Sequence, residues 1–88
     1  MVRPTLILVT TSSCHLCDDA KQVLEEIASD FGLISRVVDA SSPEGWALVA
    51  HHRPALLPLV LLDGDLFSVG RLPRKKLRRK LERLPVAR

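Results

Sequence analysis

The sequence predicts an α/β fold, in which a four-stranded mixed sheet is flanked by helices on both faces. Short apolar stretches alternate with amphipathic ones in the order β-α-β-α-β-β-α along the 88 residues. The first two predicted strands are separated by a helix, so they should run parallel with a right-handed connection. The last two are joined by Asp63-Gly64, a strong signal for a tight antiparallel hairpin.

The first predicted strand, residues 5–9, is continuously apolar, as expected for a strand covered on both faces. A polar loop through Ser13 follows it. A helical period then begins, and Gly32 is expected to end that helix. The apolar face of the helix should contain Leu16, Ala20, Val23, Leu24, Ile27 and Phe31.

A second strand is predicted over residues 33–38, followed by a short helix from Pro43 to about His51. Ser41 and Ser42 are both suitable N-caps, and Pro43 fits the first helical turn. A lone tryptophan on such a helix is usually core or partial cover of the core. We therefore expect an inward face made of Trp46, Val49 and Ala50.

The most apolar stretch, residues 56–62, contains a proline that cannot donate to a strand ladder. Pro58 is therefore expected at the start of the third strand, where a cis bond before it would fit. The returning strand should cover residues 66–69. A final helix over residues 73–84 should then be stopped by Pro85, with an apolar face made of Leu77, Leu81 and Leu84.

Length and composition indicate one globular domain over residues 1–88, with 47% apolar and 26% charged residues. The first apolar run is too short for a signal peptide and no segment approaches membrane-spanning length, so we expect a cytoplasmic protein. The charge is uneven. Residues 1–70 contain four basic and nine acidic side chains, whereas residues 71–88 contain nine basic side chains and one acidic one.

Cys14 and Cys17 are the only cysteines, and they form a Cys-x-x-Cys at the start of the first predicted helix. The helix start presents unpaired N–H groups and the positive end of its dipole to the first sulfur, which favours the thiolate. Cys17, nearly one turn on, is close enough to attack a mixed disulfide formed by Cys14. Outside oxidising compartments such a pair is more often redox-active or metal-binding than a structural disulfide.

The element order, with Cys14-His15-Leu16-Cys17 at the start of the first helix and Leu57-Pro58 at the start of the third strand, resembles the thioredoxin fold. The short form of this fold, without an extra N-terminal strand and helix, looks like glutaredoxin. It is most similar to a glutaredoxin-like branch that carries Cys-His-Leu-Cys together with Gly-Arg-Leu before the last helix, here Gly70-Arg71-Leu72. The resemblance extends over residues 5–84.

The resemblance implies a small thiol–disulfide oxidoreductase with a dithiol mechanism, acting in electron transfer and cell redox homeostasis. Cys14 would be the attacking thiolate and Cys17 the resolving thiol. Pro58 would be a cis-proline beside the site, and the backbone of Leu57 would pair with an extended substrate segment. The remaining candidate substrate-binding residues flank the first cysteine: Ser13 and His15.

Several residues that glutathione-using glutaredoxins typically carry are replaced here. The chain has no tyrosine, no lysine shortly before Cys14, and Ser68-Val69-Gly70-Arg71 where a Gly-Gly and an acid would be expected. We therefore expect protein or low-molecular-weight disulfides as substrates, and recycling by a reductase or, less favoured, by glutathione. The exchange step requires no cofactor. We expect a monomer without a membrane partner.

Other interpretations of the same residues remain open. A metal could bind Cys14 and Cys17 with His15, His51 or His52, but structural zinc usually needs two separated ligand pairs, so no metal site is predicted. A protonated His15 could stabilise the thiolate, or it could be an exposed loop residue of little effect, while Asp18 and Asp19 would oppose the thiolate. An iron–sulfur carrier bridging two chains is a further alternative.

Two further interpretations do not depend on thiol chemistry. The chain could be a binding module that keeps the fold without the activity, although the intact cysteine pair argues against this. The basic final helix could contact nucleic acid or an acidic membrane, but no aromatic residue interleaves its charges. A docking surface that steers an acidic protein partner fits the helix better.

Overall fold

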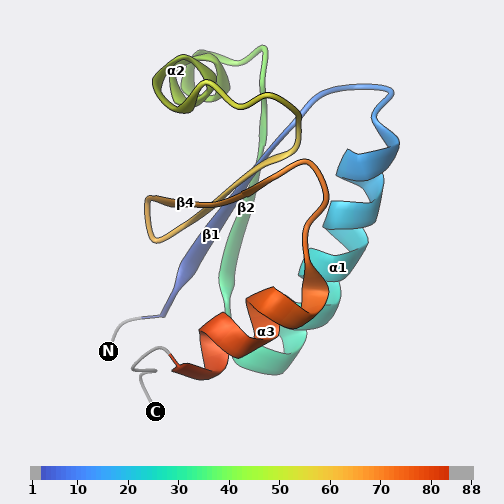
Figure 1. Ribbon diagram of the computed structural model, residues 1–88, viewed down its shortest axis with the longest axis vertical. Helices are drawn as coiled ribbons and strands as arrows, with labels where there is room; N and C mark the ends of the chain where they lie inside the picture. Colours follow the sequence, from blue (N-terminus) through green and yellow to red (C-terminus); the bar gives the residue numbers. More distant parts are fainter. Residues whose placement is uncertain (1–2, 84–88) are drawn as a thin grey trace.

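The computed structural model describes residues 3–83, and its elements follow the predicted order (Figure 1). None of the helices in this part of the chain is long and apolar enough to cross a bilayer. The elements are β1 (Thr5–Thr10), α1 (His15–Phe31), β2 (Ile34–Asp39), α2 (Pro43–His52), β3 (Leu59–Leu62), β4 (Asp65–Val69) and α3 (Arg74–Arg83).

The four strands form one mixed sheet in the order β2-β1-β3-β4. β1 runs parallel to β2 and antiparallel to β3, and β3 runs antiparallel to β4. Asp63 and Gly64, between β3 and β4, both have positive φ angles, 51° and 87°. A type I′ hairpin requires this conformation at both central residues, so the predicted turn is confirmed.

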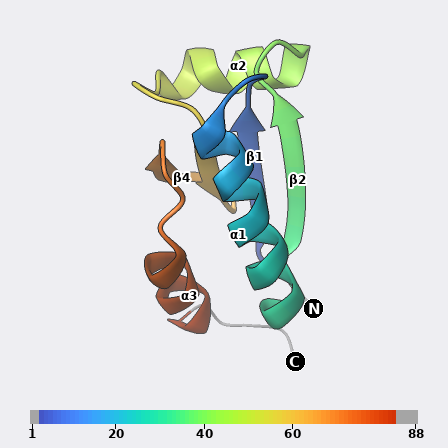
Figure 2. The ribbon, with the colours of Figure 1, turned by 90° about the vertical axis from the view of Figure 1, so that its right-hand side faces the viewer.

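Helices cover both faces of the sheet, as predicted (Figure 2). Side chains alternate along β1, so that Leu8 packs with α1 and α3, while Val9 packs on the face covered by α2. The core against α1 and α3 is the larger of the two. It consists of Leu6, Leu8, Ala20, Val23, Leu24, Ile27, Leu33, Val60, Leu62, Leu72, Leu77 and Leu81.

The apolar face of α1 is close to the predicted one, with one correction at its start. Leu16 is exposed, whereas Cys17 is buried at 1% exposure and occupies the inward position of the first turn. The inward stripe continues from Cys17 through Ala20, so Leu16 lies one residue outside it. Gly32 ends the helix as predicted, with φ 64° and its N–H donating to the Ala28 carbonyl at 3.0 Å.

The predicted inward face of α2 is wrong at two of its three positions. Trp46 is 69% exposed and Ala50 is also exposed, whereas Val49 and Leu48 pack on the cluster around Val9. The helix crosses one end of the sheet (Figure 2), and Leu48 and Val49 are its residues that pack on the apolar cluster there. Trp46 lies outside the stripe formed by these two residues and is directed away from the cluster.

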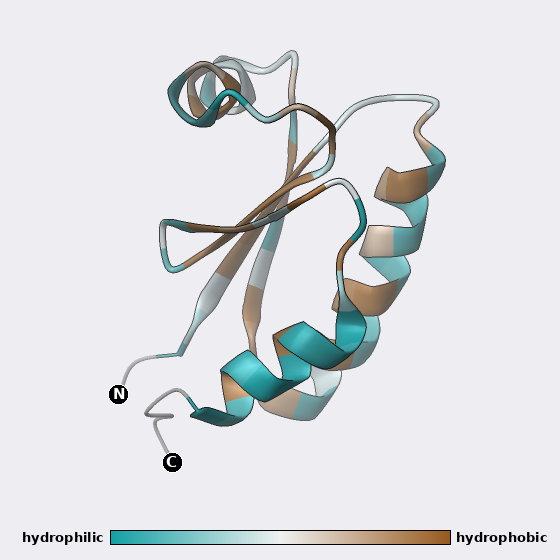
Figure 3. Ribbon diagram, in the orientation of Figure 1, coloured by the Kyte–Doolittle hydropathy of each residue, from teal (hydrophilic) through white to brown (hydrophobic). Residues whose placement is uncertain are grey.

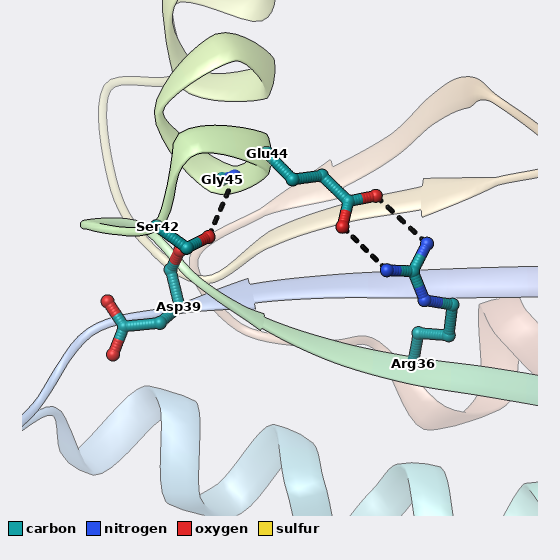
Figure 4. A network of polar contacts seen from close by, with 5 residues as sticks. All are labelled: Arg36, Asp39, Ser42, Glu44 and Gly45. Carbon is teal, nitrogen blue, oxygen red and sulfur yellow. Dashed lines mark hydrogen bonds and ion pairs between the residues drawn. The ribbon is translucent and has the colours of Figure 1, made fainter.

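The N-terminus of α2 is held mainly by polar contacts (Figure 4). Ser42 is the N-cap: its hydroxyl accepts from the Gly45 N–H at 3.0 Å and donates to the Asp39 carbonyl at 2.6 Å. Arg36 of β2 forms a two-pronged ion pair with Glu44, with N–O distances of 2.6 and 2.9 Å. Gly45 itself is buried, and a Cβ there would overlap the Asp39 backbone.

Helix α3 packs through two buried leucines, Leu77 and Leu81, and is otherwise hydrophilic (Figure 3). It begins at Arg74, one residue later than predicted. Two of its arginines reach across to acidic residues of α1, where Arg74 meets Glu26 at 3.3 Å and Arg78 meets Asp30 at 2.7 Å. The predicted roles of Leu84 and Pro85 lie outside the described residues.

Candidate active site

Three chain segments meet at the end of the sheet where β1 finishes and β3 begins. Val9, near the end of β1, pairs with Leu59, the first residue of β3, and Leu59 pairs in turn with Val69 of β4. The loop that leads from β1 to Cys14 therefore lies beside Pro58, and the Gly70 N–H donates to the Pro58 carbonyl at 2.9 Å. The sheet thus brings the cysteine loop, the Leu57-Pro58 segment and the start of the loop before α3 together at this end.

Cys14 is the N-cap of α1, as the sequence predicts. Its backbone is extended, with φ −121°, and its Sγ accepts a hydrogen bond from the Cys17 N–H at an N–S distance of 3.1 Å. The Asp18 N–H donates to the Cys14 carbonyl at 3.1 Å. A helix N-terminus offers such N–H groups to a negatively charged acceptor, so this position can stabilise a thiolate on Cys14.

The two cysteines differ in their access to solvent. Cys14 is partly exposed, whereas Cys17 is 1% exposed and is one of the buried residues of α1. Their Cα atoms are 5.2 Å apart, and the sulfur atoms are paired with each other. One sulfur can therefore be approached from outside, and the other can reach only its neighbour.

The residues on either side of Cys14 are exposed. Ser13 has a positive φ of 55°, and His15 is the first residue of α1. Asp18 and Asp19 follow in the first turns and are exposed as well, so water screens their charges from the thiols. The substrate-binding roles of Ser13 and His15 stay predictions.

The Leu57–Pro58 peptide bond is cis, which confirms the conformation considered for it. Pro58 is fully buried at the start of β3, and Leu57 is half-buried against the cluster of Val9, Leu59 and Leu61. Leu57 precedes the first ladder pair of β3, so it has no partner in the strand ladders. Its backbone is the one that the resemblance assigns to pairing with a substrate segment.

Two of the three histidines considered as metal ligands, His51 and His52, lie at the C-terminal end of α2. Their rings contact each other edge to face, with ring centroids 4.7 Å apart. Within residues 3–83, no three His, Cys, Asp or Glu side chains gather in an arrangement that could hold a metal ion.

Three exposed apolar side chains in the segments that meet at this end of the sheet were missed in the sequence. Leu16 and Val69 are each 37% exposed and Leu56 is 58% exposed. Leu56 lies against Gly70, where an added Cβ would meet its side chain at 3.3 Å, and Gly70 has a positive φ of 76°. A glycine directly after the last predicted strand was the signal that could have indicated this close approach.

Comparison with known proteins defines the class first. The structure is similar to the solution structure of an uncharacterized thioredoxin-like protein from Clostridium perfringens, with a TM-score of 0.72 and 16% sequence identity. The match covers 94% of this chain and 71% of that one, so the fold is thioredoxin-like. The family model described as "Glutaredoxin-like domain (DUF836)" matches residues 5–82. The chain therefore belongs to this glutaredoxin-like family.

Proposed function

We propose that the protein is a thiol–disulfide oxidoreductase that works through a dithiol mechanism. The observation that carries the proposal is the difference between the two cysteines: Cys14 is partly exposed and caps a helix, while Cys17 is buried beside it. An attacking sulfur needs access and a stabilised thiolate, and a resolving sulfur needs only to reach the first. The family and the fold are consistent with this chemistry.

The reaction transfers two electrons in two exchange steps. The Cys14 thiolate attacks one sulfur of a substrate disulfide, which forms a Cys14–substrate bond and releases the other sulfur as a thiolate. The Cys17 thiol then loses its proton and attacks the Cys14 sulfur, which releases the second substrate thiolate and leaves a Cys14–Cys17 disulfide. The substrate is reduced, the cysteine pair is oxidised, and an external thiol reductant must reduce the pair again.

Pro58 and Leu57 would position the substrate during these steps. The free backbone of Leu57 can add an extended substrate segment next to the start of β3, as a strand adds to a sheet edge. The exposed Leu56 side chain, which lies against Gly70 beside Pro58, would contact that segment. Two recycling assays can identify the reductant that regenerates the cysteine pair. One contains glutathione and glutathione reductase, and the other contains thioredoxin reductase.

The proposal is tested by trapping the intermediate with a neutral synthetic peptide disulfide. Reduced Cys17→Ser protein should accumulate a mixed disulfide on Cys14, detected as a mass increase in a non-reducing spectrum, because no second thiol can resolve it. Cys14→Ser should form none, because the Cys17 sulfur is buried. Circular dichroism checks the fold, and Cys17→Ala replaces Cys17→Ser if that variant does not fold. An adduct on Cys17, or none in either Cys17 variant, would contradict the mechanism.

A further inference from the structure

A groove of about 780 Å³ runs between residues 19–23 of α1 on one side and, on the other, the start of α3 with the segment that leads into it. Ala20, Val23 and Leu72 form its apolar base. Five basic side chains and one acidic one line it: Arg71, Arg74, Lys75, Lys76, Arg79 and Asp19. The groove is therefore strongly cationic, although the helix that forms its other wall belongs to the acidic part of the chain.

Only some of these cations have partners within the structure. Arg74 pairs with Glu26, and the Lys76 ammonium lies 5.5 Å from the centre of the Phe67 ring. Arg71, Lys75 and Arg79 form no ion pair with any residue between 3 and 83. Like charges lining one groove repel each other, so the groove favours an anionic occupant.

The groove opens close to the thiols on both of its walls. Asp19 follows Cys17 by two residues, and the α1 wall ends at Val23, about 9 Å along the helix axis from Cys17. On the other wall, Arg71 directly follows Gly70, whose N–H donates to the Pro58 carbonyl. A polypeptide with a disulfide at Cys14 can therefore extend a neighbouring segment into the groove.

The surroundings favour an acidic polypeptide over a lipid surface or a nucleic acid. α3 buries Leu77 and Leu81 against the core, so the helix has no apolar face left to insert into a membrane. The groove contains no aromatic side chain on which a base could stack. Phe67 and Phe31 lie under cations of α3 instead.

We propose that this groove docks an acidic segment of the protein whose disulfide Cys14 attacks. The inference rests on the proposed oxidoreductase function and adds the class of its substrate: a polypeptide with glutamates or aspartates next to the reactive disulfide. Docking raises the rate of productive encounter and adds no chemistry to the exchange. Asp19 is the one opposing charge in the groove and limits how far an acidic segment can approach α1.

The test compares two synthetic peptides with the same disulfide ring, one followed by a run of glutamates and the other by glutamines. For the wild type at low salt, kcat/KM for the glutamate peptide should exceed that for the glutamine peptide about ten-fold or more. The ratio should fall towards one at high salt, because exposed charges are then screened. The glutamine peptide reports the exchange chemistry alone.

Two double variants locate the effect, and each removes two positive charges. Arg71→Gln with Lys75→Gln should lower the glutamate-to-glutamine ratio several-fold, because both side chains line the groove. Lys80→Gln with Arg83→Gln, both on α3 but outside the groove, should leave the ratio close to the wild-type value. An equal loss in both variants would overturn the groove as the docking site.

The peptide assay distinguishes a failure of the docking inference from a failure of the proposed oxidoreductase function. Reduction of both peptides at equal rates by the wild type overturns the acidic substrate class and leaves the oxidoreductase function standing. Reduction of neither peptide overturns the oxidoreductase function and the inference with it. A ratio near one, together with tight binding of duplex DNA or of vesicles containing anionic lipid, would assign the basic groove to that partner instead.

Discussion

The two faces of the sheet are held together by different forces. On the face covered by α1 and α3, twelve buried residues form one apolar cluster, whereas the cluster on the face covered by α2 has three. α2 compensates with its Ser42 cap and with the ion pair between Arg36 and Glu44. Apolar burial stabilises the first layer, whereas the second combines a smaller apolar cluster with exposed polar contacts.

This difference divides the candidate site. The cysteines belong to α1 and so to the well-packed layer, whereas Leu57 and Pro58 follow α2 along the chain. Segments with few buried apolar contacts open at a lower free-energy cost than the core does. The relative position of the two thiols should therefore be robust, while the position of the Leu57 backbone should depend on how firmly α2 is packed.

The largest expected effect is the loss of a core side chain on the α1 face. Ile27 is fully buried, so Ile27→Ala should lower the free energy of unfolding by about 2–5 kcal/mol. Val49→Ala, its counterpart on α2, should cost clearly less, because Val49 is only partly buried. Chemical denaturation measures both. Equal losses would remove the distinction between the two layers.

The next effect concerns the close approach of α2 to the end of β2. In Gly45→Ala the new Cβ would overlap the carbonyl of Asp39, so the helix start must shift, at a cost of about 2 kcal/mol. Gly32→Ala is the matched control. Its positive φ is strained in alanine, but no atom lies within 4 Å of the added carbon, so about 1 kcal/mol is expected. A larger loss in Gly32→Ala than in Gly45→Ala would show that the approach is not tight.

Removal of the α2 cap should have a moderate effect. Ser42→Ala leaves the Gly45 N–H without its acceptor and should lower the free energy of unfolding by about 1 kcal/mol. Ser42→Thr keeps the hydroxyl and should retain most of the stability. If thermal unfolding gave the same midpoint for both variants, the hydroxyl would not be the stabilising group.

The smallest effect is the pH dependence of the Arg36–Glu44 pair. The hydrogen bond from Arg36 lowers the pKa of Glu44 below its ordinary value of 4.5, so the stabilisation is present above that value. It is lost as pH falls through the lower folded-state pKa, where the carboxylate becomes protonated. At neutral pH, Arg36→Gln should speed amide hydrogen exchange in α2 but not in α1. At a pH well below 4.5, the variant and the wild type should exchange alike. Faster exchange throughout α1 would contradict the separation of the layers.

Much of the fold was predictable because its signals are local. The helix start at Cys14, the type I′ turn at Asp63-Gly64 and the position of Pro58 each depend on backbone properties of a few neighbouring residues. The cysteine pair was predictable for the same reason, because two residues within one helical turn have a fixed separation.

The failures share a different cause, which is long-range packing. Trp46 was expected to face inward, but which stripe of α2 meets the sheet depends on how that helix crosses the strands. The ion pair between Arg78 and Asp30 joins residues 48 positions apart, and no local pattern indicates it. The basic groove could not be predicted for the same reason, because the wall that includes Val23 comes from a helix far away in sequence from the basic residues.

The central claim is that Cys14 and Cys17 form a reversible dithiol–disulfide couple, and a redox titration tests it most directly. The protein is equilibrated in dithiothreitol buffers of graded potential, acid-quenched, alkylated and analysed by mass spectrometry. The account predicts a single two-electron transition, with a tenfold change in the dithiol-to-disulfide ratio for about every 30 mV. Both cysteines should become alkylated together, and Cys17→Ser should show no such transition. A pair that stays as two free thiols in every buffer would contradict the account.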